Sequence, residues 1–147
     1  METVPQVAGD LVAWVRPDVL TQVREHAAGV GREECCGALL GRGGVVVRAQ
    51  PLANEASERT NRYFIGPRSV LALEAAAVRA GLEVIGFYHS HPSGGAEPSK
   101  VDLGHAWPGY LYLIVSPGDG ADGVRGWRLR EDRRGFLPVR IVEENGG

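Results

Sequence analysis

Two histidines separated by one residue are the part of this chain whose types and spacing could do chemistry. His89 and His91 follow an apolar run, residues 84–88, that is typical of a buried strand. Because residues i and i+2 of a strand share one face, both imidazoles can point at the same centre. Imidazole nitrogens are common metal ligands, so the pair indicates a metal site, although a His-x-His pair is weak grounds when it stands alone.

A carboxylate follows the histidine pair after a turn rich in glycine, serine and proline. Pro92 and the glycines turn the chain back, and Ser99 opens a short helix that carries Asp102 one turn inside. The Asp102 carboxylate can then reach the point on which the two imidazoles converge. Two histidines and a carboxylate suit a catalytic zinc ion, which keeps three protein ligands and a water. We therefore expect one Zn²⁺ per chain, with a bound catalytic water, held by His89, His91 and Asp102.

Ser99 also has a structural interpretation. A serine at the N-cap with an acid three residues later is close to a capping box, and this role does not exclude a catalytic one. The joint pattern is more specific than its parts. Five named positions at about one chance in twenty each give roughly one random match in a few million starting points.

The run from His89 to Asp102 resembles the JAMM motif of MPN-domain metalloproteases, H-x-H-P-x6-S-x2-D, with every spacing matched. That family also has a glutamate ahead of a short apolar strand, and residues 33–41 resemble this segment. Its bacterial members place one residue and then Cys-Gly after the glutamate, which favours Glu34 over Glu33. Residues 62–67 are similar to the family's strand before its second helix. The resemblance spans about residues 11–130.

This resemblance implies a fold, a reaction and residue roles. The implied fold is α/β (α+β), a single MPN-type domain over residues 1–147 with its core at about 11–142. It has a curved mixed β-sheet flanked by helices, similar to cytidine deaminases. The implied reaction is hydrolysis of a peptide or isopeptide bond after the C-terminal Gly-Gly of a ubiquitin-like or sulfur-carrier protein. Glu34 would be the general base, and Ser99 would donate a hydrogen bond to the developing oxyanion.

Periodicity and turn residues predict the elements that must position these side chains. Ser90 should point away from the metal because side chains alternate along a strand. A strand edge near the site could hold an extended Gly-Gly tail by adding it to the sheet. Helices are expected over residues 17–30, over 67–81 and from 99 onward, and strands over 11–16, 36–40, 45–48, 63–65, 84–88, 110–115, 124–130 and 136–142.

Composition narrows the class of protein. The chain has 147 residues, a net charge of −2 and no clustered basic stripe, so we expect no nucleic-acid partner. It shows no secretory signal and no apolar run near the ~20 residues that span a bilayer, so we expect no membrane partner. Cys35 and Cys36 are adjacent and cannot form a disulfide framework, which indicates a reducing, cytoplasmic location. Nothing in the pattern indicates the oligomeric state.

Two other functions stay open. A RadC-like protein linked to DNA repair shares His-Pro-Ser-Gly and Pro-Ser, found here at residues 91–94 and 98–99, and a non-catalytic MPN scaffold is the other. The segment at Glu34 favours the peptidase branch over RadC, and scaffolds usually lose metal ligands.

Several further residues have a structural interpretation that we prefer to a functional one. Cys36 is expected to be an inert core thiol. The other residues of this kind are His26 and His105, the packing aromatics Trp107, Tyr110 and Trp127, and the terminal Gly146-Gly147.

Overall fold

The computed structural model describes residues 11–145, which contain both strands and helices. The terminal Gly146-Gly147 lies outside these residues. Within residues 11–145, no helix is long and apolar enough to cross a bilayer. The elements are β1 (Val12–Val15), α1 (Pro17–Val30), β2 (Cys36–Arg42), β3 (Val45–Leu52), α2 (Pro67–Arg79), β4 (Glu83–Ser90), α3 (Lys100–His105), β5 (Leu111–Val115), a 3-10 turn (Pro117–Gly123), β6 (Val124–Leu129) and β7 (Phe136–Glu143).

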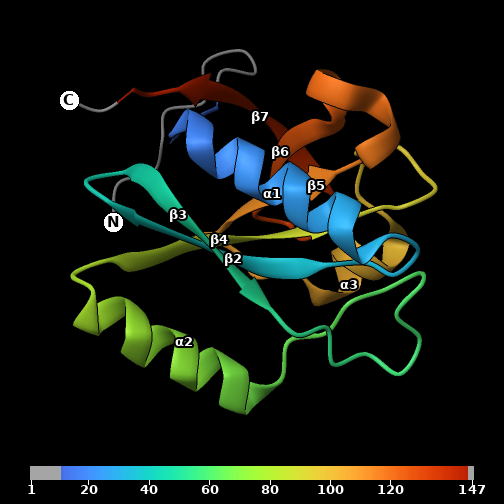
Figure 1. Ribbon diagram of the computed structural model, residues 1–147, viewed down its shortest axis with the longest axis horizontal. Coiled ribbons are helices and arrows are strands. Elements are labelled where there is room, and N and C mark those ends of the chain that lie inside the picture. Colours follow the sequence, from blue (N-terminus) through green and yellow to red (C-terminus); the bar gives the residue numbers. More distant parts are fainter. Residues whose placement is uncertain (1–10, 146–147) are drawn as a thin grey trace.

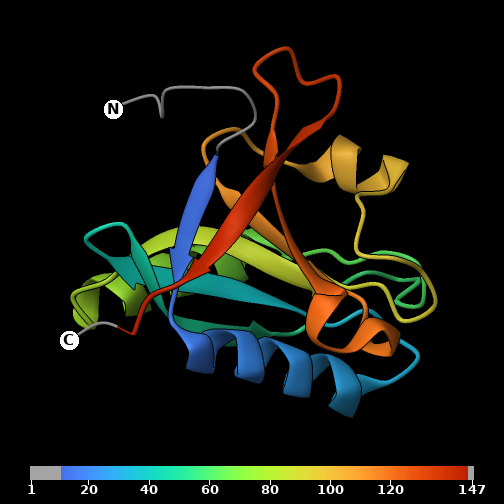
Figure 2. The same cartoon turned by 90° about the horizontal axis from the view of Figure 1, so that it is seen from above.

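The strands form one mixed sheet that closes on itself in the order β1-β3-β2-β4-β5-β6-β7. β2 pairs antiparallel with β3 and β4, whereas β4 and β5 run parallel. The sheet closes because β1 pairs parallel with both β3 and β7. Figure 2 shows β1 and β7 side by side, crossing the direction of β2 and β4. The prediction of an α+β domain with a curved mixed sheet is confirmed, and the curvature is strong enough to close the sheet.

Helices α1 and α2 lie on opposite faces of β2, β3 and β4 (Figure 1). This layering follows from alternation along the strands. Leu39 of β2 packs in the same core as the buried side of α1, while its neighbours Ala38 and Leu40 pack with Leu73 and Ala77 of α2. The apolar residues of α1 recur at helical spacing and form its buried stripe: Val19, Leu20, Val23 and Ala27.

Tyr88 fixes β4 against α1 immediately before the first candidate ligand. Its ring is fully buried, and its hydroxyl lies 2.7 Å from Nδ1 of His26 on α1. Gly37 of β2 lies opposite, where a Cβ atom would overlap the tyrosine ring. His26 therefore has a structural contact, as the sequence predicts. Tyr88 of β4 contacts His26 of α1 and packs over Gly37 of β2.

Two expectations about local structure are wrong. Residues 63–65 form no strand, because Asn54 and Glu55 take the backbone groups of Phe64 that a strand ladder would use. Trp107 is not a packing residue, since it follows α3 and is 63% exposed.

The strand β4 offers no free edge beside the candidate site, because β2 pairs with one of its sides and β5 with the other.

Candidate metal centre

The end of β4 brings the two histidines together. His89 is 1% exposed, and its Nε2 lies 3.2 Å from Nε2 of His91. Ser90, between them, points the other way and accepts a hydrogen bond of 2.8 Å from the Cys35 N–H. The predicted alternation is therefore confirmed, and both imidazoles face one centre.

Helix α3 delivers the carboxylate to the same centre. Ser99 is its N-cap: Ser99 Oγ accepts from the Asp102 N–H at 3.1 Å, and Asp102 Oδ2 accepts from the Ser99 N–H at 2.9 Å. This capping box is the one that the sequence predicts. The Asp102 oxygens also lie 3.0 Å from Nε2 of His89 and 3.1 Å from Nε2 of His91.

The loop between His91 and α3 is held by three consecutive carbonyl groups, those of residues 94–96. They accept hydrogen bonds from Ser116 Oγ at 2.6 Å, from His91 Nδ1 at 2.9 Å and from Trp127 Nε1 at 2.9 Å. Because carbonyls only accept, His91 must carry a proton on Nδ1. This bond leaves the Nε2 lone pair directed at the centre of the cluster.

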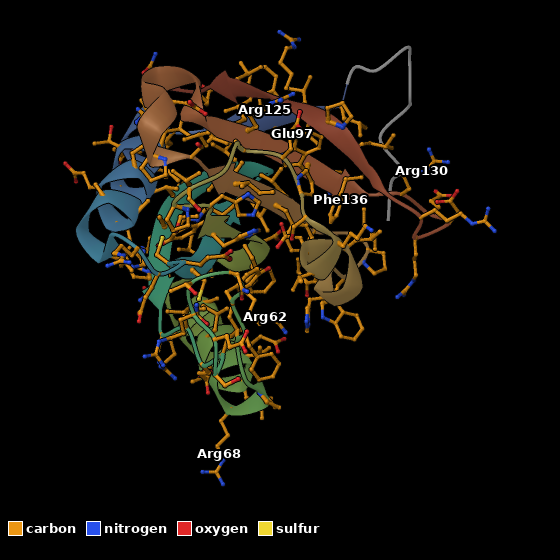
Figure 3. The ribbon with its side chains drawn as sticks, turned by 90° about the vertical axis from the view of Figure 1, so that its right-hand side faces the viewer. Arg62, Arg68, Glu97, Arg125, Arg130 and Phe136 are labelled. Atoms are coloured by element: carbon orange, nitrogen blue, oxygen red, sulfur yellow. The ribbon has the colours of Figure 1, made fainter. Side chains whose placement is uncertain are left out.

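An exposed ion pair lies on the outer side of the same loop. Nη1 of Arg125, on β6, is 3.4 Å from Oε2 of Glu97, and its guanidinium group lies 5.0 Å from the centre of the Trp127 ring. Figure 3 shows Arg125 and Glu97 next to each other over this loop. Exposed pairs of this kind contribute about 0–1 kcal/mol. The hydrogen bonds to the carbonyls therefore hold the loop more firmly than the ion pair does.

The cluster requires a positive charge at its centre. Burial lowers the pKa of His89, which favours its neutral form. Burial would also lower the pKa of His91, but its bonds to Asp102 and Gly95 outweigh this effect and raise the pKa. Burial would raise the pKa of Asp102, yet the bonds from both histidines hold it well below its usual range. An ionised carboxylate thus faces the His91 lone pair, and either a proton or a metal cation must lie between them.

A zinc ion fits the spacing of these donors. Ligand atoms of a tetrahedral zinc lie about 3.3 Å apart, because each bond to nitrogen or oxygen is about 2.0–2.1 Å long. The two Nε2 atoms are 3.2 Å apart, and the Asp102 carboxylate lies 3.0 Å from His89 through Oδ1 and 3.1 Å from His91 through Oδ2. Two imidazoles and one carboxylate are also a donor set that zinc prefers.

Glu34 lies at the edge of this cluster, just before β2. It is 5% exposed, and its Oε1 has no hydrogen-bond partner among the described residues. Donor atoms of Glu34, His89 and His91 all lie within 4.8 Å of one another. Burial raises the pKa of Glu34 to about 7, partly offset by His91. Its neighbour Glu33 is exposed and pairs with Arg59 at 3.3 Å, so the structure brings Glu34 rather than Glu33 to the cluster.

Two carboxylates could therefore complete a metal site with the histidines. Donor atoms of Glu34 lie within 4.8 Å of those of both histidines, whereas the Asp102 oxygens lie 3.0 and 3.1 Å from the two Nε2 atoms. Asp102 is therefore better placed than Glu34 to be the third ligand. Glu34 then remains beside the ligands as a carboxylate whose Oε1 has no hydrogen-bond partner within residues 11–145.

The remaining predicted residues take different places. Ser99 is exposed, and because its oxygen accepts from Asp102, its hydroxyl proton can still be donated to a substrate. His105 is exposed at the end of α3, outside the cluster. Burial raises the pKa of the Cys36 thiol to about 12, which agrees with an inert core residue.

Sequence reasoning missed the residue that covers His89. The Tyr63 ring stacks on the His89 imidazole, with ring centres 4.4 Å apart. Tyr63 also lines an apolar groove of about 830 Å³ between α2 and the segment that follows α3, with Phe64, Leu71 and Trp107 among its other walls. A tyrosine in a polar connecting segment gives no sequence signal that its ring stacks on a histidine. The resemblance of residues 62–67 to a family segment was the one available signal, and it was interpreted as a strand.

The family described as prokaryotic homologs of the JAB domain matches residues 16–130. This chain belongs to that family. The JAB domain contains the whole cluster, from Glu34 to Asp102. The JAMM/MPN resemblance drawn from the motif is thereby confirmed.

Two named proteins are similar to this JAB-family chain. It is 40% identical over 126 residues to a desampylase from Haloferax volcanii, covering 84% of this chain and 90% of the relative. It is 34% identical over 129 residues to "Probable TtuB-protein conjugate cleaving protease" from Thermus thermophilus, covering 88% of this chain and 84% of the relative. Both are named as enzymes, and the prediction of a JAMM-type hydrolase is confirmed at this level.

Solved structures agree with the fold. A protein from Desulfitobacterium hafniense has a TM-score of 0.81 at 26% identity and covers 92% of this chain and 94% of its own. A JAB1/MPN domain protein from Archaeoglobus fulgidus has a TM-score of 0.58 at 21% identity, with coverages of 90% and 100%. The second likeness concerns the fold alone. The JAB domain described here is thus a fold shared across distant sequences.

Proposed function

We propose that this JAB-family protein is a zinc-dependent metallopeptidase that hydrolyses the peptide or isopeptide bond after the C-terminal Gly-Gly of a ubiquitin-like or sulfur-carrier protein. One observation carries the proposal. The Nε2 atoms of His89 and His91 and the carboxylate of Asp102 converge within 3.2 Å, beside the buried Glu34, whose Oε1 has no partner in the described part of the chain. Three ligands with a separate base form the donor set of a hydrolytic zinc centre.

The ligands in this proposal are His89, His91 and Asp102, for one Zn²⁺ per chain. When bound, zinc supplies Lewis-acid activation of a water in its fourth ligand position and of the scissile carbonyl. The bonds of His91 to Gly95 and of Ser99 to Asp102 orient two of the ligands before any metal arrives.

Glu34 is the general base of the proposed reaction. A carboxylate whose pKa is near 7 can accept a proton from the attacking water and pass it to the leaving amine. Ser99 is the proposed hydrogen-bond donor to the oxygen of the scissile carbonyl, because its hydroxyl proton is available on the exposed side of the cluster. Neither Glu34 nor Ser99 is a proposed metal ligand, so both side chains are available for these two roles.

The substrate class rests on two supports. One relative is named as a protease that cleaves conjugates of the protein TtuB, which is a macromolecular substrate. The apolar groove reaches the cluster at Tyr63, whose ring forms one of its walls and stacks on His89. A folded partner can lie over such a groove while a tail without side chains passes the aromatic wall, since two glycines permit close backbone approach.

The test is a cleavage assay on a small β-grasp protein that is extended past its Gly-Gly terminus by a peptide or joined to a lysine. Mass spectrometry should find cleavage after the second glycine, dependent on zinc and abolished by EDTA. A matched substrate with Ala-Ala in place of Gly-Gly should have kcat/KM lower by about 10-fold or more, because the added methyl groups clash near the reacting carbonyl.

The outcomes separate the parts of the proposal. Zinc-dependent cleavage that ignores the diglycine would keep the metallopeptidase and remove the ubiquitin-like substrate. Failure to cleave any such fusion, together with binding of branched DNA, would replace the proposal by a RadC-like function.

A further inference from the structure

Asn54 makes every hydrogen bond that its carboxamide group can make. Its Nδ2 donates to the carbonyl of Glu34 and to the carbonyl of Arg62, each at 3.0 Å. Its Oδ1 accepts from the N–H groups of Ala56 at 3.0 Å and Phe64 at 3.1 Å. A half-buried side chain that is fully satisfied in this way holds its partners in one arrangement.

The four bonds join the two segments that surround the candidate base. One bond reaches the backbone of Glu34 itself. Two others reach the residues on either side of Tyr63, the residue whose ring stacks on His89. A single side chain, 20 residues away from Glu34 in sequence, therefore ties the base to the aromatic wall of the ligand histidine.

Glu34 depends on such a tie more than the ligands do. Its Oε1 is buried without a partner among the described residues, so side-chain hydrogen bonds do not fix where that oxygen points. Its direction follows from its backbone, which is held by the Asn54 bond and by a bond of 2.6 Å from its N–H to the carbonyl of Arg59. An error of about 1 Å in the placement of a reacting group can lower a rate 100-fold.

The far end of the same connection is also anchored. The Glu55 carboxylate accepts from the Gly66 N–H at 2.7 Å and from Ser69 Oγ at 2.9 Å, at the start of α2. The Glu55 N–H donates to the carbonyl of Phe64 at 2.8 Å. Hydrogen bonds of Asn54 and Glu55 therefore hold the segment between β3 and α2 in one loop conformation.

We propose that Asn54 is a positioning residue for the hydrolytic reaction, acting through the placement of Glu34 rather than through the metal. This inference rests on the proposed function, because it assigns Glu34 as the base. No other residue of similar size can replace the carboxamide. Aspartate lacks the two donors, alanine lacks all four bonds, and glutamine is longer by one methylene group.

The primary variant is Asn54→Asp, which keeps the size and the two acceptor bonds but turns an oxygen toward the carbonyls of Glu34 and Arg62. The single-turnover rate constant and kcat on the Gly-Gly fusion should both fall by about 10- to 100-fold, because a misplacement of up to about 1 Å has a cost of that size. KM and the dissociation constant for zinc, titrated separately, should stay within about 2-fold, because Asn54 contacts no proposed ligand. Asn61→Asp is the matched control, since it adds the same charge to an exposed position of the same loop.

A second arm shows through which residue Asn54 acts. In a Glu34→Gln background, changing Asn54 should lower the residual rate by no more than about 2-fold, because the base is already absent. A full additional loss in that background would overturn the proposal. Zinc binding that weakens in parallel with kcat would also overturn it, since the residue would then be structural.

A third arm requires no substrate. In Asn54→Ala, which also serves if the aspartate variant does not fold, the amides of Ala56 and Phe64 should exchange hydrogen about 10-fold faster or more. The amides of β5 should not change. Unchanged exchange at Ala56 and Phe64 would overturn the proposed role of Asn54, even if turnover falls. If the wild-type protein cleaves no fusion, the proposed function fails, and this arm decides the role of Asn54 by itself.

Discussion

The site has two halves that the chain builds in different ways. The metal half consists of His89, His91 and Asp102, which lie within 14 residues and are held mainly by neighbours in sequence, such as Gly95 and Ser99. The base half consists of Glu34 and Tyr63, which are held across longer distances in sequence through Asn54. One half is therefore local and the other is assembled by the fold.

This difference separates what binds the metal from what uses it. In the metal half, the bond of His91 to Gly95 and the contacts of Asp102 with both imidazoles do not involve Glu34. The base half contains a buried carboxylate whose Oε1 has no hydrogen-bond partner among the described residues. Changes in the metal half should remove metal and turnover together, whereas changes in the base half should remove turnover alone.

The largest effect is expected at the histidines. In His91→Ala the zinc content should fall from about one per chain to below about 0.1, and turnover should be lost with it, because two ligands hold zinc poorly. Elemental analysis of metal-replete protein measures this. The control His105→Ala changes an exposed histidine near the site and should keep a full complement. A His91→Ala protein that keeps its zinc would contradict the assignment of zinc binding to the metal half.

Ser99 belongs to the metal half, because it caps α3, and it also has a proposed role in the reaction. Ser99→Ala should lower kcat by roughly 100-fold if the hydroxyl serves the oxyanion, and should lower the free energy of unfolding by about 1 kcal/mol through loss of the cap. Ser99→Thr keeps the hydroxyl and should retain most of the kcat and most of the free energy of unfolding. Kinetics and urea denaturation on the same three proteins measure the two effects. A small loss of rate with the full loss of stability would leave Ser99 as a cap only.

A smaller effect is expected where distant residues brace the metal half. Ser116→Ala removes the 2.6 Å bond to the Gly94 carbonyl and should destabilise the protein by about 1 kcal/mol, because a part-buried hydrogen bond is lost while the exposed Gly94 can still bond to water. Zinc affinity should fall by about 10-fold or less, through the loop that orients His91. Competition with a chelator measures the affinity. Ser93→Ala, at an exposed position of the same loop, is the control, and equal effects in both would contradict the brace.

The smallest effect concerns α1, whose His26 contacts neither carboxylate but the Tyr88 hydroxyl. Burial lowers the pKa of His26, so the unfolded state, with a pKa of about 6.5, binds the proton more tightly than the folded state does. The stabilisation is therefore fully present above about pH 6.5 and is lost as the pH falls below it. In metal-free protein, the urea midpoint should drop less between pH 7.5 and 5.5 in His26→Gln than in the wild type. An identical drop in both would remove His26 as a source of the pH dependence.

The metal half and most elements could be predicted because their signals are local. His-x-His at the end of an apolar run uses the two-residue period of a strand, and Ser99 to Asp102 is the spacing of a helix cap. The helices that begin at Pro17 and Pro67 follow from proline at the first turn and apolar residues at helical spacing. Choosing Glu34 over Glu33 needed the family resemblance, since two adjacent acids look alike in sequence.

The rest could not be predicted because it depends on tertiary contacts. Asn54 is an ordinary polar loop residue until the fold places Glu34 and Phe64 within reach of its carboxamide. Tyr63 suits a strand by composition, yet side-chain bonds to its neighbours replace the strand ladder. Closure of the sheet likewise requires β1 to meet β7, which are the first and last strands described.

Zinc content and single-turnover rate, measured on the same samples of Glu34→Gln and Asp102→Asn, test most directly which carboxylate binds the metal and which one acts on the substrate. Glu34→Gln should keep about one zinc per chain and lose roughly 100-fold or more in rate, because an amide cannot accept the proton of the attacking water. Asp102→Asn should lose both, since a neutral amide is a poor ligand beside His89 and His91. Loss of zinc in Glu34→Gln, with zinc retained in Asp102→Asn, would contradict the assignment and make Glu34 the third ligand.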